Sequence, residues 1–122
     1  MDVRLADRSH HLEQDEPDSD GLVGWTYEYD LYVLVASQLE VTARSYTDTS
    51  HEVSLLAFRC DGAPIGLGDV KQSHVAAVEA AAGYLRSMGF TSVQWLDGET
   101  YVGSALQRPS VDLAALCHRQ IR

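Results

Sequence analysis

The clearest pattern in the chain is a period-two alternation of side chains that begins at Trp25. One face of an extended chain would carry Trp25, Tyr27, Tyr29, Leu31, Val33 and Val35. The opposite face would carry Thr26, Glu28, Asp30 and Tyr32. Such alternation predicts a strand with one buried face.

Two further strands are expected to follow. Residues 39–44 alternate again, with Leu39, Val41 and Ala43 as the apolar set. Residues 53–60 have the sequence VSLLAFRC, a nearly continuous apolar run that favours a central strand. The pair Asp61-Gly62 has the chemistry of a turn and should end that strand.

A long helix is predicted over residues 69–88. Its apolar side chains recur every three or four positions and form one stripe, made of Val75, Val78, Ala82, Leu85 and Met88. Asp69 could cap the helix, with Gln72 three positions later as in a capping box, and Gly89 should end it. Leu85 is therefore expected in the core.

After the helix, residues 91–96 and 100–102 flank the turn sequence Asp97-Gly98-Glu99, which predicts a hairpin. A short last helix should open at Pro109-Ser110. The expected order is three strands, a helix, two strands and a helix. This order predicts an α+β fold, in which an antiparallel sheet of about five strands has the long helix packed on one face.

Composition divides the chain into two parts. At 122 residues, with 45% hydrophobic residues, the chain can form one domain with a single core. Residues 1–22 hold seven acids, two arginines and few apolar side chains, so we expect an acidic, disordered tail there and a single domain over residues 23–122. A short helix over residues 2–14 is the alternative.

The charge balance excludes some classes of partner. Nine Lys and Arg against eighteen Asp and Glu give a net charge of −9, and no basic cluster is present. Nucleic acids and anionic membranes both require such clusters, so neither is an expected partner. The chain has no apolar run of membrane-spanning length and no secretory signal, so we expect a cytoplasmic location.

Cys60 and Cys117 have no metal-binding spacing and are expected to be buried free thiols.

Candidate catalytic chemistry is confined to one polar stretch. Asp48, His51 and Glu52 lie close enough in sequence for a carboxylate to orient the imidazole as a general base, with Tyr46 and Ser50 beside them. However, Asp, Ser and Thr are also the usual residues of turns, because their side chains bond to nearby backbone groups. We favour a turn between two strands. A small hydrolase or isomerase that uses these three residues is the alternative function.

Two other patterns are weaker. The glycine-containing segment DGAPIGLGDVK, residues 61–71, matches neither nucleotide-binding fingerprint, and Asp69 stands where a phosphate would sit. A strand-to-helix connection is the preferred interpretation there, and a small-molecule cleft is a third possibility for function. His10 and His11, with Glu13 and Asp15, could chelate a metal only on a rigid scaffold. We therefore predict no metal site and no cofactor.

Aromatic residues supply the preferred functional hypothesis. Trp25, Tyr27 and Tyr29 exceed what one strand needs for a core, and Trp and Tyr are enriched at protein interfaces. We expect a small acidic, non-enzymatic binding module that acts through protein–protein contacts and forms a dimer, its partner being another protein or a second copy. In charge and in the order of its elements the chain resembles, in layout only, the secretion chaperones of bacterial export systems, although their leading amphipathic helix has no counterpart here.

Overall fold

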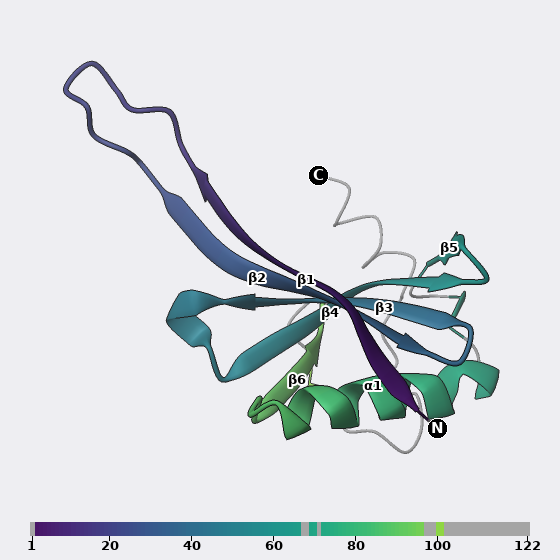
Figure 1. Ribbon diagram of the computed structural model, residues 1–122. Coiled ribbons are helices and arrows are strands. Elements are labelled where there is room, and N and C mark those ends of the chain that lie inside the picture. The colour runs from purple at the N-terminus through teal and green to yellow at the C-terminus, as the bar shows by residue number, and fades with distance from the viewer. Residues whose placement is uncertain (1, 67–68, 71, 97–99, 102–122) are drawn as a thin grey trace.

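The computed structural model describes residues 2–66, 69–70, 72–96 and 100–101. These residues form a six-stranded sheet with helix α1 (Val75–Ser87) packed on one face (Figure 1). The strands are β1 (Val3–Gln14), β2 (Thr26–Ala36), β3 (Leu39–Tyr46), β4 (Glu52–Cys60), β5 (Ala63–Ile65) and β6 (Ser92–Trp95). Strands β1 to β5 pair antiparallel in chain order, and β6 pairs with β4 in parallel. The predicted α+β class is confirmed.

Strand β1 is the largest departure from expectation. The prediction of a disordered tail over residues 1–22 is wrong for Val3–Gln14, because β1 pairs with β2 from Val3 opposite Ala36 to Gln14 opposite Thr26. Val3 and Leu5 pack against the core, and most other side chains of this edge strand are exposed and polar. Charged residues are usual on edge strands, since they discourage unwanted pairing. Composition alone could not separate such a strand from a disordered tail.

In strand β2 the buried face is the opposite of the predicted one. Tyr32, Leu34 and Ala36 are the side chains that pack beneath α1, with 4%, 0% and 0% of their surfaces exposed. Leu31 and Val33 are only half-buried on the other face. Both faces of this half of the strand are apolar, so the alternation did not define which one meets the helix.

Helix α1 confirms the predicted stripe but begins later than expected. Its buried side chains are Val75, Ala77, Val78, Ala81, Ala82 and Leu85. A short 3₁₀ turn (Gln72–His74) precedes it, and His74 is the N-cap, so the predicted cap at Asp69 is wrong. Met88 follows the last helical residue and is 38% exposed, which removes it from the stripe. Gly89 then adopts the left-handed φ of 112° that favours glycine, as predicted for the helix end.

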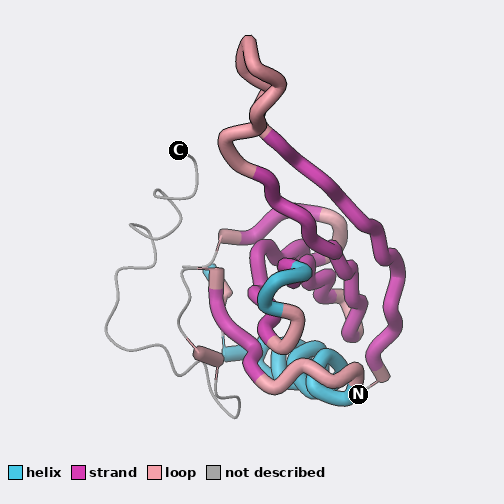
Figure 2. Tube along the Cα trace, turned by 90° about the vertical axis from the view of Figure 1, so that its left-hand side faces the viewer, coloured by secondary structure: helices cyan, strands magenta, loops and turns pink. Residues whose placement is uncertain are grey.

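The hairpin formed by β1 and β2 is longer than the rest of the sheet and projects from it (Figures 1 and 2). Strand β3 ends at Tyr46, opposite Tyr29, so no third strand among the described residues lies beside residues 12–28. We call residues 12–28 the arm. At its outer end, Asp18 organises the turn, because its carboxylate accepts a hydrogen bond of 2.9 Å from the Leu22 backbone N–H.

The remaining predictions concern the second half of the chain. Strand β6 confirms the first strand of the expected hairpin, and an isolated antiparallel bridge joins Gln94 to Thr100. The turn at residues 97–99, the helix expected at Pro109 and Cys117 all lie outside the described residues. Cys60 is half-buried rather than buried, and it forms no disulfide with any residue that the structure describes. Within the described ranges, no helix has the length and apolar character needed to cross a membrane.

Candidate functional site

The sheet face opposite α1 carries a row of aromatic rings, which we call the aromatic row: Trp25, Tyr27, Tyr46 and Tyr29. Ring centroids lie 5.1 Å apart for Trp25 and Tyr27, and 6.0 Å apart for Tyr27 and Tyr46. Tyr46 and Tyr29 meet edge to face at 5.7 Å. Tilted and edge-to-face contacts at these distances are favourable. The row begins in solvent, where Trp25 is 45% and Tyr27 50% exposed, and ends at Tyr29, which is 9% exposed.

Strand pairing explains why the row forms. Successive side chains of a strand point to opposite faces, so Tyr27 and Tyr29 share one face of β2. Tyr46 lies directly opposite Tyr29 in the register between β2 and β3. From β1, the His11 ring stacks on Tyr29 at 5.2 Å, and the Tyr29 hydroxyl donates a hydrogen bond of 2.9 Å to Glu13. This hydrogen bond, together with burial, raises the pKa of Tyr29 above its usual value.

Arginine side chains already lie over the inner tyrosine rings. The guanidinium carbon of Arg44 is 4.8 Å from the ring centre of Tyr46 and 5.7 Å from that of Tyr29. On the other face of the sheet, Arg8 lies 5.1 Å from the ring centre of Tyr32. These are cation–π contacts, which the planar guanidinium makes readily. In the described part of the chain, no cationic side chain lies over the outer rings of Trp25 and Tyr27.

A hollow of about 460 Å³ opens beside the rings of Tyr27 and Tyr46. It is lined by Thr26, Tyr27, Glu28, Tyr46, Thr47, Asp48 and Thr49. The 3₁₀ turn Thr47–Thr49 forms one wall, and the Thr47 hydroxyl donates a hydrogen bond of 3.3 Å to the Glu28 carbonyl. Among the described residues, the lining comprises two tyrosines, three threonines, Asp48 and Glu28, and no basic residue. Such a lining favours a cationic group.

The structure separates the candidate catalytic residues. Asp48 lines the hollow, whereas His51 and Glu52 do not. The His51 side chain is 62% exposed, and its ring nitrogen Nε2 is 3.6 Å from Glu52 Oε1. Among the described residues, no hydrogen bond or ion pair joins Asp48 to His51. The predicted turn between the two strands is confirmed, and the lack of catalytic function stays a prediction.

His10 lies in the segment that was predicted to be a disordered tail. In the structure it forms a polar cluster with Arg8, Glu28 and Asp30. The cluster is on the same face of the sheet as α1, beyond the part that the helix covers. The Nδ1 of His10 lies 2.6 Å from Asp30, and its Nε2 lies 2.7 Å from Glu28. Asp30 also accepts a hydrogen bond of 3.2 Å from Arg8. Hydrogen bonds to Asp30 and then Glu28 raise the pKa of His10, and the bond from His10 lowers the pKa of Asp30. His11 points to the opposite face, so the two histidines cannot chelate one ion together.

We expect this cluster to make stability depend on pH. Because the folded state raises the pKa of His10, its contribution is full below the unfolded value of about 6.5 and is lost as pH rises through the folded pKa. Asp30 behaves in the opposite sense, because its lowered pKa gives a contribution that is present above about 3.8 and lost as pH falls through the folded pKa.

The measurement is a pair of thermal melts. At pH 5.5 the melting temperature of wild type should be higher than that of His10→Gln. At pH 8.5 this difference in melting temperature should be smaller. Asp30→Asn removes the main partner of His10 and should weaken the same pH dependence. If the melting temperatures of wild type and His10→Gln differ by the same amount at both pH values, His10 does not cause the pH dependence.

Comparisons with known proteins find no match for this chain. A scan against models of protein families gives none. Searches of curated protein sequences and of solved structures also give none.

Sequence reasoning found part of this site. Trp25, Tyr27 and Tyr29 are the predicted interface residues, and the structure brings them together with Tyr46. Tyr46 and Arg44 were missed as members of the same surface. Their signal is the alternation of residues 39–44, which continues to Tyr46 and places both side chains on the polar face of that strand.

Proposed function

We propose that the protein is a non-enzymatic binding module that contacts another protein through the outer end of the aromatic row. Trp25 and Tyr27 carry this proposal, because they are large, mutually packed rings that remain about half exposed. They lie on an arm that stands clear of the core (Figure 1). Exposed Trp and Tyr side chains are frequent anchors of protein interfaces, since a partner gains by covering their apolar area.

The charge of the arm favours a different protein over a second copy at this surface. Residues 12–28 contain six carboxylates and no Lys or Arg: Glu13, Asp15, Glu16, Asp18, Asp20 and Glu28. Two such arms would repel each other. The expected dimer stays a prediction, would use another surface, and is tested by light scattering, which separates one chain of 13.4 kDa from two. A cytoplasmic location stays a prediction.

A peptide selection tests the arm as a binding surface. Random peptides displayed on phage are selected against the wild-type protein, and the affinities of enriched peptides are then measured. We expect the double variant Trp25→Ala/Tyr27→Ala to weaken binding at least about ten-fold, because truncating an interface anchor commonly costs more than about 1 kcal/mol.

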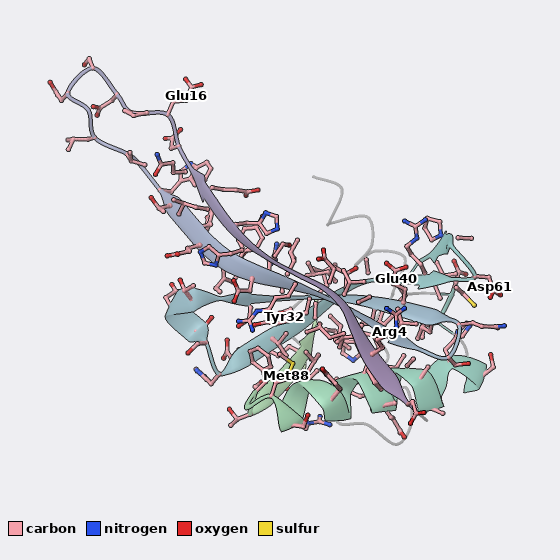
Figure 3. The ribbon with its side chains drawn as sticks, viewed as in Figure 1. Arg4, Glu16, Tyr32, Glu40, Asp61 and Met88 are labelled. Carbon is pink, nitrogen blue, oxygen red and sulfur yellow. The ribbon has the colours of Figure 1, made fainter. Side chains whose placement is uncertain are left out.

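Met88→Ala is the matched control, because Met88 is also an exposed apolar side chain, at 38%, but lies in the helix layer and not on the arm (Figure 3). It should bind the same peptides as wild type does. Circular dichroism melts would verify that both variants are folded. Enriched peptides that bind wild type and the double variant equally would overturn the proposal, and so would a selection that enriches none.

A further inference from the structure

We propose that the partner presents a basic segment, and that an arginine side chain of this segment occupies the hollow beside Tyr27 and Tyr46. The inference rests on the proposed function, since it specifies the chemistry of the partner at the same arm. Three independent features of the surface support it: the charge of the arm, the cations already placed over the inner rings, and the lining of the hollow.

Charge complementarity is the first feature. The arm has six carboxylates and no Lys or Arg, and Glu16 lies near its outer end (Figure 3). Between Arg8 and Arg44 the chain has no Lys or Arg at all. Interfaces pair surfaces of opposite potential, which accelerates encounter and rejects partners of like charge. A basic segment therefore fits this arm better than a neutral or acidic one.

The protein's own arginines supply the second feature. Arg44 covers the inner rings Tyr46 and Tyr29 at 4.8 and 5.7 Å, so this face already pairs a guanidinium with tyrosines. Tyr27 continues the same row outward, 6.0 Å from Tyr46, and remains 50% exposed. A guanidinium from a partner would extend the existing arrangement onto Tyr27. Arginine is favoured over lysine for such stacking, because its charge is spread over a plane.

The lining of the hollow is the third feature. Its volume of about 460 Å³ lies in the range of about 300–1,000 Å³ that is usual for binding pockets. Asp48 is exposed at its wall, and no described residue forms a hydrogen bond or ion pair with its carboxylate. The carboxylate of Glu28, which is also in the lining, is already hydrogen-bonded to His10. Asp48 is thus the free acceptor for a charge-assisted hydrogen bond from the guanidinium.

Fluorescence anisotropy with labelled homopeptides tests the inference on the full chain. The probes are hexa-arginine, hexa-lysine and hexa-glutamate amides, measured at about 50 mM salt, where exposed charges are weakly screened. We expect hexa-arginine to bind at least about three-fold more tightly than hexa-lysine, and hexa-glutamate not to bind. Asp48→Asn and Tyr27→Ala should each weaken the binding of hexa-arginine at least about five-fold, since each removes one partner of the guanidinium.

Asp61→Asn is the matched control for Asp48→Asn. It removes one exposed carboxylate at the other end of the molecule (Figure 3), and should change the affinity less than about two-fold. Thermal melts must show that all variants are folded. If Asp48→Asn and Asp61→Asn weaken binding equally, the peptide responds only to overall charge and the inference is overturned.

The peptide selection described above separates this inference from the proposed function. Enriched peptides that depend on Trp25 and Tyr27 and are rich in arginine would support both. Peptides that depend on the two rings but lack basic residues would overturn the basic partner and leave the binding module in place. Peptides that do not depend on the rings would overturn both.

Discussion

Deleting residues 1–22 should lower the melting temperature by at least about 10 °C, because β1 completes the sheet over the core. Tyr32 and Leu34 are 4% and 0% exposed, and removing β1 would uncover their side of the sheet and the backbone groups of β2. Uncovering a buried large apolar side chain costs about 1.5–3 kcal/mol, and the packed Val3 and Leu5 would also be lost. Domains of this size shift by roughly 2–8 °C per kcal/mol.

The control for this deletion shortens the arm without removing β1. Replacing residues 17–23 with the two-residue turn Asn-Gly retains the hydrogen bond of 3.0 Å from the Asp15 N–H to the Trp25 carbonyl. This variant should melt within about 3 °C of wild type, since the removed residues are exposed and distant from the core. If the variant that lacks residues 1–22 also melts within about 3 °C of wild type, β1 contributes little to stability and the domain does not need it.

Leu85→Ala should reduce the free energy of unfolding by about 2–5 kcal/mol. Leu85 is fully buried on the sheet-facing side of α1, so its truncation loses apolar burial and leaves a cavity. Chemical denaturation measures this change, with the midpoint shifting at a nearly constant slope. Met88→Ala, three residues later and 38% exposed, should change the free energy by less than about 0.5 kcal/mol. Equal effects for the two variants would mean that the helix packs with a different face.

The local pattern of apolar and polar residues was sufficient to predict helix α1, which packs one stripe of side chains against the core. The stripe of α1 was predicted because burial against a flat sheet selects side chains at the helical period. Turns were also predictable, since Asp61 and Gly62 adopt φ values of 53° and 82° in the left-handed region that Asp and Gly tolerate. The start of α1 was not predictable, because Asp69 resembles a cap but the backbone hydrogen-bonds Asp69 to Gly66 instead.

The candidate site was only partly predictable for a related reason. Trp25 and Tyr27 are conspicuous in the sequence as aromatic residues that one strand does not need. Tyr46 and Asp48 join them only through the register of β3 and the turn after it. A register of this kind is set by pairing over the whole sheet, so a short stretch of sequence does not contain it.

The sequence by itself determined the α+β class, the strands from residue 26 to residue 60, the buried stripe of α1 and the aromatic residues of the surface. Only the tertiary structure decided that residues 3–14 are a strand, and which face of β2 is buried. The reason is physical. A helix stripe records its environment in its side chains, whereas both faces of the inner half of β2 are apolar and do not distinguish the buried one. Strand β1 is held largely by backbone hydrogen bonds that every non-proline residue can make. The composition of β1 therefore does not indicate that it pairs with β2.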